Sequence, residues 1–113
     1  MNVNELLSKP ELLTQLAEEA AELSQAALKL RRAMTGENPT PKTVTECVTA
    51  LNEEVADVEI CLNELGFYRD WLTAERSKLY ESKTKRWISR LLARPKPTLS
   101  TMYGVMMGGT KNG

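Results

Sequence analysis

The sequence contains no histidine, and this absence excludes several kinds of active site. Ser–His and Cys–His nucleophilic triads need an imidazole base, and Cys–His zinc sites and histidine-ligated di-iron bundles need imidazole ligands. Any metal ion bound by this chain would therefore be held mainly by carboxylates.

Other absences narrow the class of protein. No run of about 18 uncharged apolar residues occurs, so we expect no membrane-spanning helix. Nothing after Met1 has the pattern of a secretory signal, and the two cysteines, Cys47 and Cys61, lie in apolar periodic segments. We therefore expect reduced core cysteines in a cytoplasmic protein. Because 15 basic side chains balance 15 acidic ones, we expect no nucleic-acid partner.

Apolar periodicity predicts three long helices, and there is no strand pattern. The first is expected over about residues 9–34, with Ser8 as N-cap, Pro10 in the first turn and Gly36 as terminator. Lys29 falls in its last turns, where a cation suits the helix dipole.

The second predicted helix runs from about Thr43 to Leu65. Thr43 stands three residues before Glu46, which is the spacing of a capping box, and Gly66 closes the helix. A third helix, with a sparser apolar pattern, is expected over about residues 67–93.

These elements predict an all-α fold, an antiparallel bundle of about three long helices in one domain over residues 1–94. The three helices present more apolar surface than they can cover for one another, so we expect a second copy to complete the core. Residues 95–113 are expected to form a C-terminal tail, either a flexible end or an arm over a partner subunit.

The zero net charge hides a strong segregation along the chain. Residues 43–65 carry six acidic side chains and no basic one, whereas residues 66–97 carry nine basic and three acidic ones. The two segments could simply pack side by side and neutralise each other, although surface ion pairs contribute little stability.

Acidic residues also recur at a spacing of three in the first two helices. Glu18-Glu19-Ala20-Ala21-Glu22 occupies the first, and Glu53-Glu54-Val55-Ala56-Asp57 the second. Positions i and i+3 share a helix face, so carboxylates of two antiparallel helices could converge at the rim of the core. A hard divalent cation such as Mg²⁺ would hold them together, and the basic segment could neutralise a bound di- or triphosphate. The alternative is a solvated, glutamate-rich helix face.

The two acidic motifs, residues 18–23 (Glu-Glu-Ala-Ala-Glu-Leu) and residues 53–58 (Glu-Glu-Val-Ala-Asp-Val), resemble the E-x-x-E and E-x-x-D pattern of a known family. This family is the MazG-like, all-α nucleoside triphosphate pyrophosphohydrolases. The basic stretch 83–87 also resembles their third-helix element. The resemblance covers about residues 13–92.

The resemblance implies Mg²⁺-dependent cleavage of an NTP or dNTP to the monophosphate and pyrophosphate, with Mn²⁺ as a possible substitute, in a homodimer or homotetramer. It implies the following roles: metal ligands Glu19, Glu22, Glu54 and Asp57; candidate catalytic acids Glu53 and Glu18, of which one could orient the attacking water, or both could simply be solvated; and phosphate contacts Lys83, Arg86 and Lys78. The alternative function is a non-catalytic helical interaction protein, or a nucleotide-binding protein, with a solvated acidic face.

Overall fold

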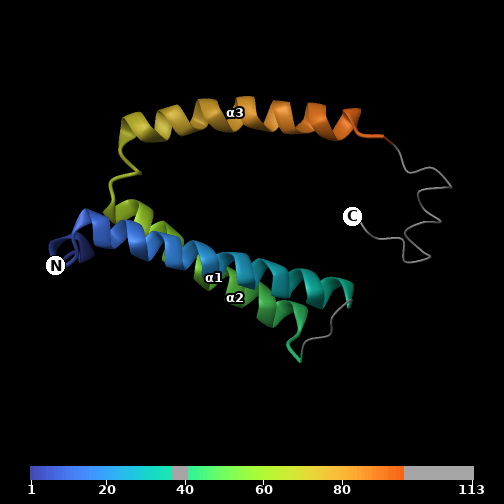
Figure 1. The fold of residues 1–113 in the computed structure, drawn as a ribbon, viewed down its shortest axis with the longest axis horizontal. Helices are drawn as coiled ribbons and strands as arrows, with labels where there is room; N and C mark the ends of the chain where they lie inside the picture. The colour runs from blue at the N-terminus through green and yellow to red at the C-terminus, as the bar shows by residue number, and fades with distance from the viewer. Residues whose placement is uncertain (37–40, 96–113) are drawn as a thin grey trace. The chain divides into compact units, whose positions relative to one another are not determined.

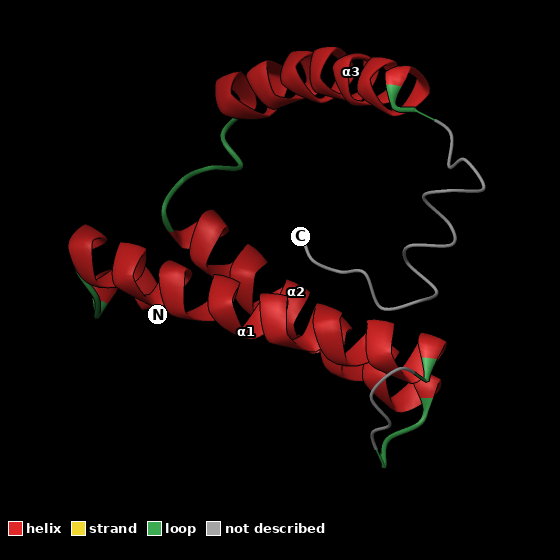
Figure 2. Ribbon diagram, turned by 45° about the vertical axis from the view of Figure 1, so that its right-hand side comes forward, coloured by secondary structure: helices red, strands yellow, loops and turns green. Residues whose placement is uncertain are grey.

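The computed structural model describes residues 1–36 and 41–95. Its elements, in chain order, are a short 3₁₀ turn η1 (Val3–Glu5) and the α-helices α1 (Lys9–Thr35), α2 (Val44–Glu64) and α3 (Asp70–Ala93). Only helices and loops occur in these residues (Figure 2), which confirms the all-α class. The chain divides into two compact units, Met1–Ala74 and a second that begins at Glu75. Apart from Pro95, the predicted tail lies outside the described residues.

The start and the end of α1 follow the sequence prediction. Ser8 Oγ accepts a hydrogen bond from the Glu11 N–H at 3.2 Å, and the Glu11 carboxylate accepts one from the Ser8 N–H at 2.8 Å. This capping box satisfies two donors that the first helical turn leaves unpaired. These hydrogen bonds from the Ser8 backbone and side chain also lower the pKa of Glu11. Gly36 ends the helix with φ of 70°, a left-handed conformation that a residue with a Cβ rarely adopts.

The N-terminus of α2 also carries the predicted capping box. Thr43 Oγ1 accepts from the Glu46 N–H at 3.1 Å, and the Glu46 carboxylate accepts from the Thr43 N–H at 2.9 Å. These bonds lower the pKa of Glu46, and the charge of Lys42 adds to the shift.

The turn that ends α2 includes residues that were predicted to begin the third helix. The Phe67 N–H donates to the Leu62 carbonyl at 2.9 Å, and the Gly66 N–H to the Asn63 carbonyl at 3.0 Å, with Gly66 at φ of 86°. This is the Schellman arrangement, which turns the chain away from the helix axis. Because Phe67 belongs to this turn, α3 begins at Asp70, three residues later than predicted.

α1 and α2 form an antiparallel hairpin in which α2 runs back alongside α1 (Figure 1). The buried side chains of the described residues all lie on the facing sides of these two helices: Leu12, Ala26, Cys47 and Cys61. Both cysteines are free thiols, as predicted. Four buried side chains make a thin core for a unit of this size.

Several apolar side chains along one face of α2 remain accessible. Val44, Val48 and Val55 recur at helical spacing and are 40%, 48% and 38% exposed. On α1, Leu13 and Leu28 are both 52% exposed. The hairpin therefore buries one apolar seam and leaves further apolar side chains outside it.

The N-terminal turn η1 is tied to the end of α2, a contact that the sequence did not predict. The Asn4 N–H donates to Glu64 Oε1 at 2.9 Å. The Asn2 N–H donates to Glu5 Oε2 at 2.6 Å, which closes the turn itself. Val3 and Leu7 line a cavity together with residues of α1 and α2.

α3 is a regular helix of 24 residues with no buried side chain. Its surface carries an exposed ion pair between Lys85 Nζ and Glu81 Oε1, 3.3 Å apart at the i, i+4 spacing. None of the described helices has the length and apolarity that a membrane crossing requires.

Candidate functional site

Three carboxylates converge where α1 faces α2. Glu19 comes from α1, and Glu54 and Asp57 come from successive turns of α2. One oxygen of each lies within 4.8 Å of the others. We call these three residues the carboxylate cluster. The i, i+3 spacing places Glu54 and Asp57 on one face of α2, and the antiparallel packing brings Glu19 opposite them.

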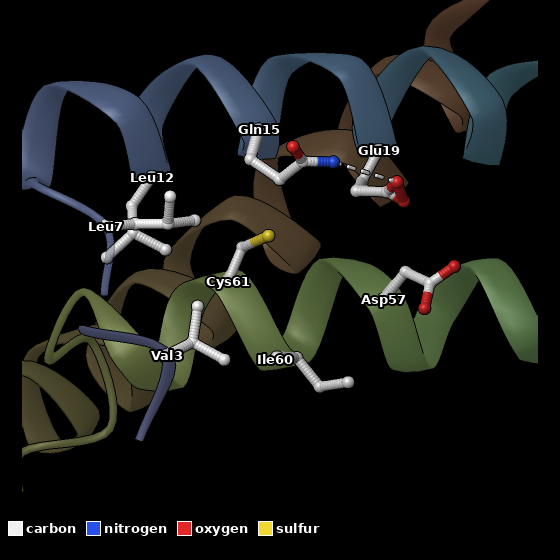
Figure 3. Close-up of a pocket in the computed structure, with 8 residues that line it drawn as sticks. All are labelled: Val3, Leu7, Leu12, Gln15, Glu19, Asp57, Ile60 and Cys61. Atoms are coloured by element: carbon white, nitrogen blue, oxygen red, sulfur yellow. Dashed lines mark hydrogen bonds between the residues drawn. The ribbon is translucent and has the colours of Figure 1, made fainter. Parts of the chain in front are cut away.

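A neighbouring amide fixes one member of the cluster. Gln15 Nε2 donates to Glu19 Oε1 at 3.4 Å, across one turn of α1 (Figure 3). Figure 3 also shows Glu19 and Asp57 reaching toward each other from the two helices. Gln15 thus restrains the orientation of the Glu19 carboxylate without belonging to the cluster.

The environment of Glu54 disfavours its charged form. The side chain is half-buried, and partial loss of hydration raises its pKa above the ordinary value. The nearby charges of Asp57, Glu19, Glu22 and Glu53 raise the pKa further, in that order. The carboxylates therefore lie close enough to repel one another, and a bound cation would reduce this repulsion.

The other predicted acids lie around the cluster, not within it. Glu22, the fourth predicted metal ligand, lines a cavity next to the cluster together with Glu54. Glu18 and Glu53 are exposed neighbours of Glu19 and Glu54 in sequence, and Glu53 acts on Glu54 through its charge. Their catalytic roles remain predictions.

An apolar cavity of about 200 Å³ opens on one side of the cluster (Figure 3). Its lining combines two cluster residues with one amide and mainly apolar side chains: Val3, Leu7, Leu12, Gln15, Glu19, Asp57, Ile60 and Cys61. Partial burial and the charges of Glu19 and Asp57 raise the pKa of the Cys61 thiol. The thiol therefore stays protonated at neutral pH and is neither a ready nucleophile nor a ready metal ligand.

A second cavity, of about 190 Å³, lies on the other side of the cluster. Its lining comes from α1, α2 and the residue before the α2 N-cap: Glu22, Gln25, Ala26, Lys29, Lys42, Cys47, Ala50 and Glu54. We call it the lysine cavity, because it contains two lysines where the apolar cavity contains no basic side chain. Glu54 belongs to both the cluster and the lysine cavity.

The predicted phosphate contacts lie on α3, in the second unit. Lys83 and Arg86 line a surface hollow of that helix together with Trp87 and Arg90. These four residues follow the i, i+3, i+4, i+7 spacing of one helix face. Lys78 is exposed on the same helix. Contact of these side chains with phosphate remains a prediction.

Several residues of the site were not predicted from the sequence. Gln15 lies four residues before Glu19, a spacing that could have marked it as a hydrogen-bonding partner. Val3 and Leu7 precede the first helix and carried no periodic signal. Lys29 was explained by the helix dipole, and Lys42 precedes the second predicted helix. Their common cavity depends on the pairing of α1 with α2, which the sequence does not show.

Comparisons with protein-family models, with curated proteins and with solved structures find no match.

Proposed function

We propose that this protein is a Mg²⁺-dependent nucleoside triphosphate pyrophosphohydrolase, which cleaves an NTP or dNTP to the monophosphate and pyrophosphate. The observation that carries the proposal is the convergence of Glu19, Glu54 and Asp57 from two helices, with oxygens within 4.8 Å of one another. Exposed acidic side chains often cluster without binding a metal, so the fit of this cluster to Mg²⁺ matters.

The cluster suits a hard divalent cation in its chemistry and in its dimensions. Mg²⁺ takes oxygen ligands at about 2.1 Å in octahedral geometry, so neighbouring ligand oxygens lie about 3 Å apart and opposite ones about 4 Å. Small side-chain rotations would bring the three oxygens into this range. Three protein ligands leave the remaining positions for water and substrate phosphate, which is how proteins usually bind Mg²⁺. Glu22, which lines the adjoining cavity, would bind the ion through water or directly.

When bound, Mg²⁺ supplies electrostatic stabilisation of the charge that moves between phosphate oxygens in the reaction. Glu19, Glu54 and Asp57 would hold the ion, and Gln15 would hold Glu19. In the reaction, the oxygen of a water molecule bonds to the α-phosphorus. The bond from that phosphorus to the bridging oxygen breaks, the electron pair leaves with pyrophosphate, and a proton passes to solvent or to a nearby carboxylate such as Glu53.

The proposal includes assembly with a second copy of the chain. The hairpin of α1 and α2 buries four side chains, while Val44, Val48 and Val55 stay substantially exposed along one face of α2. A helix with such a face usually packs against another helix. In a two-fold dimer the same stripe on each chain would cover the other, which completes the bundle.

The test is pyrophosphate release from a panel of NTPs and dNTPs, measured with Mg²⁺ and with EDTA. We expect Mg²⁺-dependent release by the wild-type chain and a loss of at least about 100-fold in Asp57→Asn, since a site with one ligand removed holds its ion poorly. Glu59→Gln is the matched control, because Glu59 is an exposed acid of the same helix outside the cluster. Helicity should be equal in all three proteins.

Two results would contradict the proposal. Full activity in Asp57→Asn would show that the cluster takes no part in the reaction. Absence of release for every nucleotide, together with no effect of Mg²⁺ on the melting temperature, would favour the alternative of an interaction protein with a solvated acidic face. An ion that binds only the folded state must raise the melting temperature.

A further inference from the structure

The charged side chains of α3 are sorted onto two faces. On one face, acidic and basic side chains stand at the spacing of helical neighbours. Glu81 comes three positions after Lys78 and four before Lys85, whose Nζ lies 3.3 Å from Glu81 Oε1. Glu75 comes three positions before Lys78. The charges of this face therefore compensate one another.

The cations of the opposite face have no such compensation. No acidic residue stands three or four positions from Lys83, Arg86 or Arg90. Within residues 1–36 and 41–95, none of these three side chains has a carboxylate partner. Residues 75–95 carry seven basic and two acidic side chains. The balance of the whole chain, from which no nucleic-acid partner is expected, therefore conceals a local excess of positive charge.

Aromatic rings alternate with these cations. Ring and cation follow one another along one side of the helix, at spacings of three, four and three residues, over about 15 Å: Tyr80, Lys83, Trp87 and Arg90. Tyr80 is 77% exposed and Trp87 is 66% exposed. Two surface hollows follow the same side, one lined by Tyr80 and the other by Trp87, and Lys83 belongs to both. With Arg86, which lines the second hollow, we call these residues the α3 stripe.

The occupant of the α3 stripe has to be anionic and has to offer flat rings. A second copy of α3 does not match, because Lys83 and Arg90 would meet like charges in a two-fold pairing through this face. An anionic membrane surface does not match either. An interfacial helix keeps its apolar and basic residues on separate faces, whereas Lys83 and Arg90 stand on either side of Trp87. A single nucleic-acid strand has both properties, since its phosphates alternate with bases that present ring faces.

We propose that the α3 stripe binds single-stranded nucleic acid. Tyr80 and Trp87 stack on unpaired bases, and the cations between and beside them, Lys83, Arg86 and Arg90, contact the phosphates. Lys83 and Arg86 are also predicted phosphate contacts of a nucleotide substrate, because a strand and a nucleotide present the same phosphate chemistry. The inference goes beyond the proposed function and does not depend on it.

The test is a titration of a labelled single strand of about 12 nucleotides with the full chain, followed by fluorescence anisotropy, for DNA and RNA in turn. Trp87→Ala should weaken binding about fivefold or more, which is the effect of losing one stacked base, whereas Trp87→Phe should retain most of the affinity. Titrations between about 50 and 200 mM salt give the slope of log affinity against log salt. Arg90→Ala should reduce this slope by about 0.7, the value for one phosphate contact on a single strand.

Lys85→Ala is the matched control. It removes the same charge from the same helix, but on the face where Lys85 is paired with Glu81. The affinity should therefore change less than about twofold, and the salt slope should not change. Because α3 has no buried side chain, all variants should keep the helicity of the wild-type chain, which circular dichroism checks.

Three results would overturn the inference. Equal affinity for a duplex of the same length would exclude stacking, since paired bases do not expose their ring faces. Equal affinity for a nucleoside triphosphate would assign the stripe to a single nucleotide. Binding to vesicles that contain phosphatidylserine, or salt-dependent self-association, without binding to either strand would identify a membrane surface or a second copy as the occupant.

Failure of this inference and failure of the proposed function can be told apart. Strand binding that depends on Trp87, in a chain without Mg²⁺-dependent pyrophosphate release, would contradict the proposed function alone. Mg²⁺-dependent release that depends on Asp57, in a chain that binds neither strand, would overturn the inference alone.

Discussion

Glu19 of α1 and Glu54 of α2 face each other across the helix seam with carboxylate oxygens within 4.8 Å. Neither has a lysine or arginine in the cluster to compensate its charge. Hydrophobic packing of the two helices therefore brings together groups that repel each other, and loss of hydration and the neighbouring acids raise the pKa of Glu54 as a result. We expect this repulsion to lower the stability of the metal-free protein, and under the proposed function a bound cation would relieve it.

Glu54→Gln is expected to stabilise the metal-free protein at neutral pH while it removes metal binding. The pKa of Glu54 is raised in the folded state, so its favourable contribution is present below the unfolded-state pKa and is lost as pH rises through the folded-state pKa. The charged form of the carboxylate, which gains population as pH rises, is the destabilising one. Thermal melts in EDTA should give the variant the higher melting temperature at pH 7, with the difference disappearing in acid.

The same melts with Mg²⁺ should reverse the order. Mg²⁺ should raise the melting temperature of the wild-type chain and have little effect on Glu54→Gln, because binding to the folded state alone stabilises it. Glu59→Gln should behave as wild type under both conditions. If Glu54→Gln melted below the wild-type chain in EDTA at pH 7, the repulsion described for the cluster would be refuted.

Gln15→Leu is expected to weaken Mg²⁺ binding about tenfold and leave the fold intact. Gln15 donates to Glu19 Oε1, and removal of a group that orients a metal ligand usually costs 10- to 100-fold in affinity. Because this hydrogen bond is long, at 3.4 Å, we expect a loss of affinity at the lower end of that range. Mg²⁺ titration by calorimetry measures the effect, and Gln15→Glu should weaken binding less than Gln15→Leu, since a carboxylate can itself serve as a ligand. Equal Mg²⁺ affinity in Gln15→Leu and wild type would exclude the orienting role.

Ser8→Ala is expected to destabilise the chain by about 1 kcal/mol, because the Glu11 N–H loses its acceptor at the start of α1. Glu11→Gln should also destabilise, in a pH-dependent way. Hydrogen bonds from Ser8 lower the pKa of Glu11 in the folded state, so its contribution is present above the unfolded-state pKa and is lost as pH falls through the folded-state pKa. Denaturant titrations at pH 7 and in acid measure both effects. A pH-independent loss in Glu11→Gln would show that charge plays no part in the cap.

Val48→Asp is expected to dissociate the proposed dimer. Val48 lies on the exposed stripe of α2, and a charged residue there would be buried without a partner if two copies packed through this face. Sedimentation analysis should give a dimer or larger assembly for the wild-type chain and at least a tenfold weaker association for the variant. Thr49→Asp, an exposed position on another face of α2, is the control. A wild-type chain that is monomeric at all concentrations would contradict the proposed assembly.

The helix limits were predictable because each depends on a few adjacent residues. Ser8 as N-cap, Thr43 with Glu46, and Gly36 all act within one or two turns, and these signals were found in the sequence, whereas the pairing of Ser8 with Glu11 was not predicted. The start of α3 was predicted three residues too early. Apolar Phe67 fits a helical pattern, but its N–H is taken up by the turn that follows α2.

The site was predictable only in part, because its residues come together through helix pairing. The i, i+3 motifs identified Glu19, Glu54 and Asp57, since one turn of helix fixes the spacing within each pair. The motifs could not show that Glu22 belongs to the adjoining cavity. They also could not show that Lys29 and Lys42 share that cavity, because this depends on the register of α1 against α2.

The two cysteines lie on opposite sides of the carboxylate cluster, with Cys61 in the wall of the apolar cavity and Cys47 in the wall of the lysine cavity. Each cavity therefore contains one native thiol whose reactivity depends on what occupies that cavity, so no labelling site has to be introduced. Both thiols are nearly buried, so alkylation by a small reagent should be slow and sensitive to whatever fills the space beside them. In Cys47→Ala and Cys61→Ala variants the remaining thiol reports on one cavity alone. Protection by a ligand fragment then shows at which end of the seam that fragment resides.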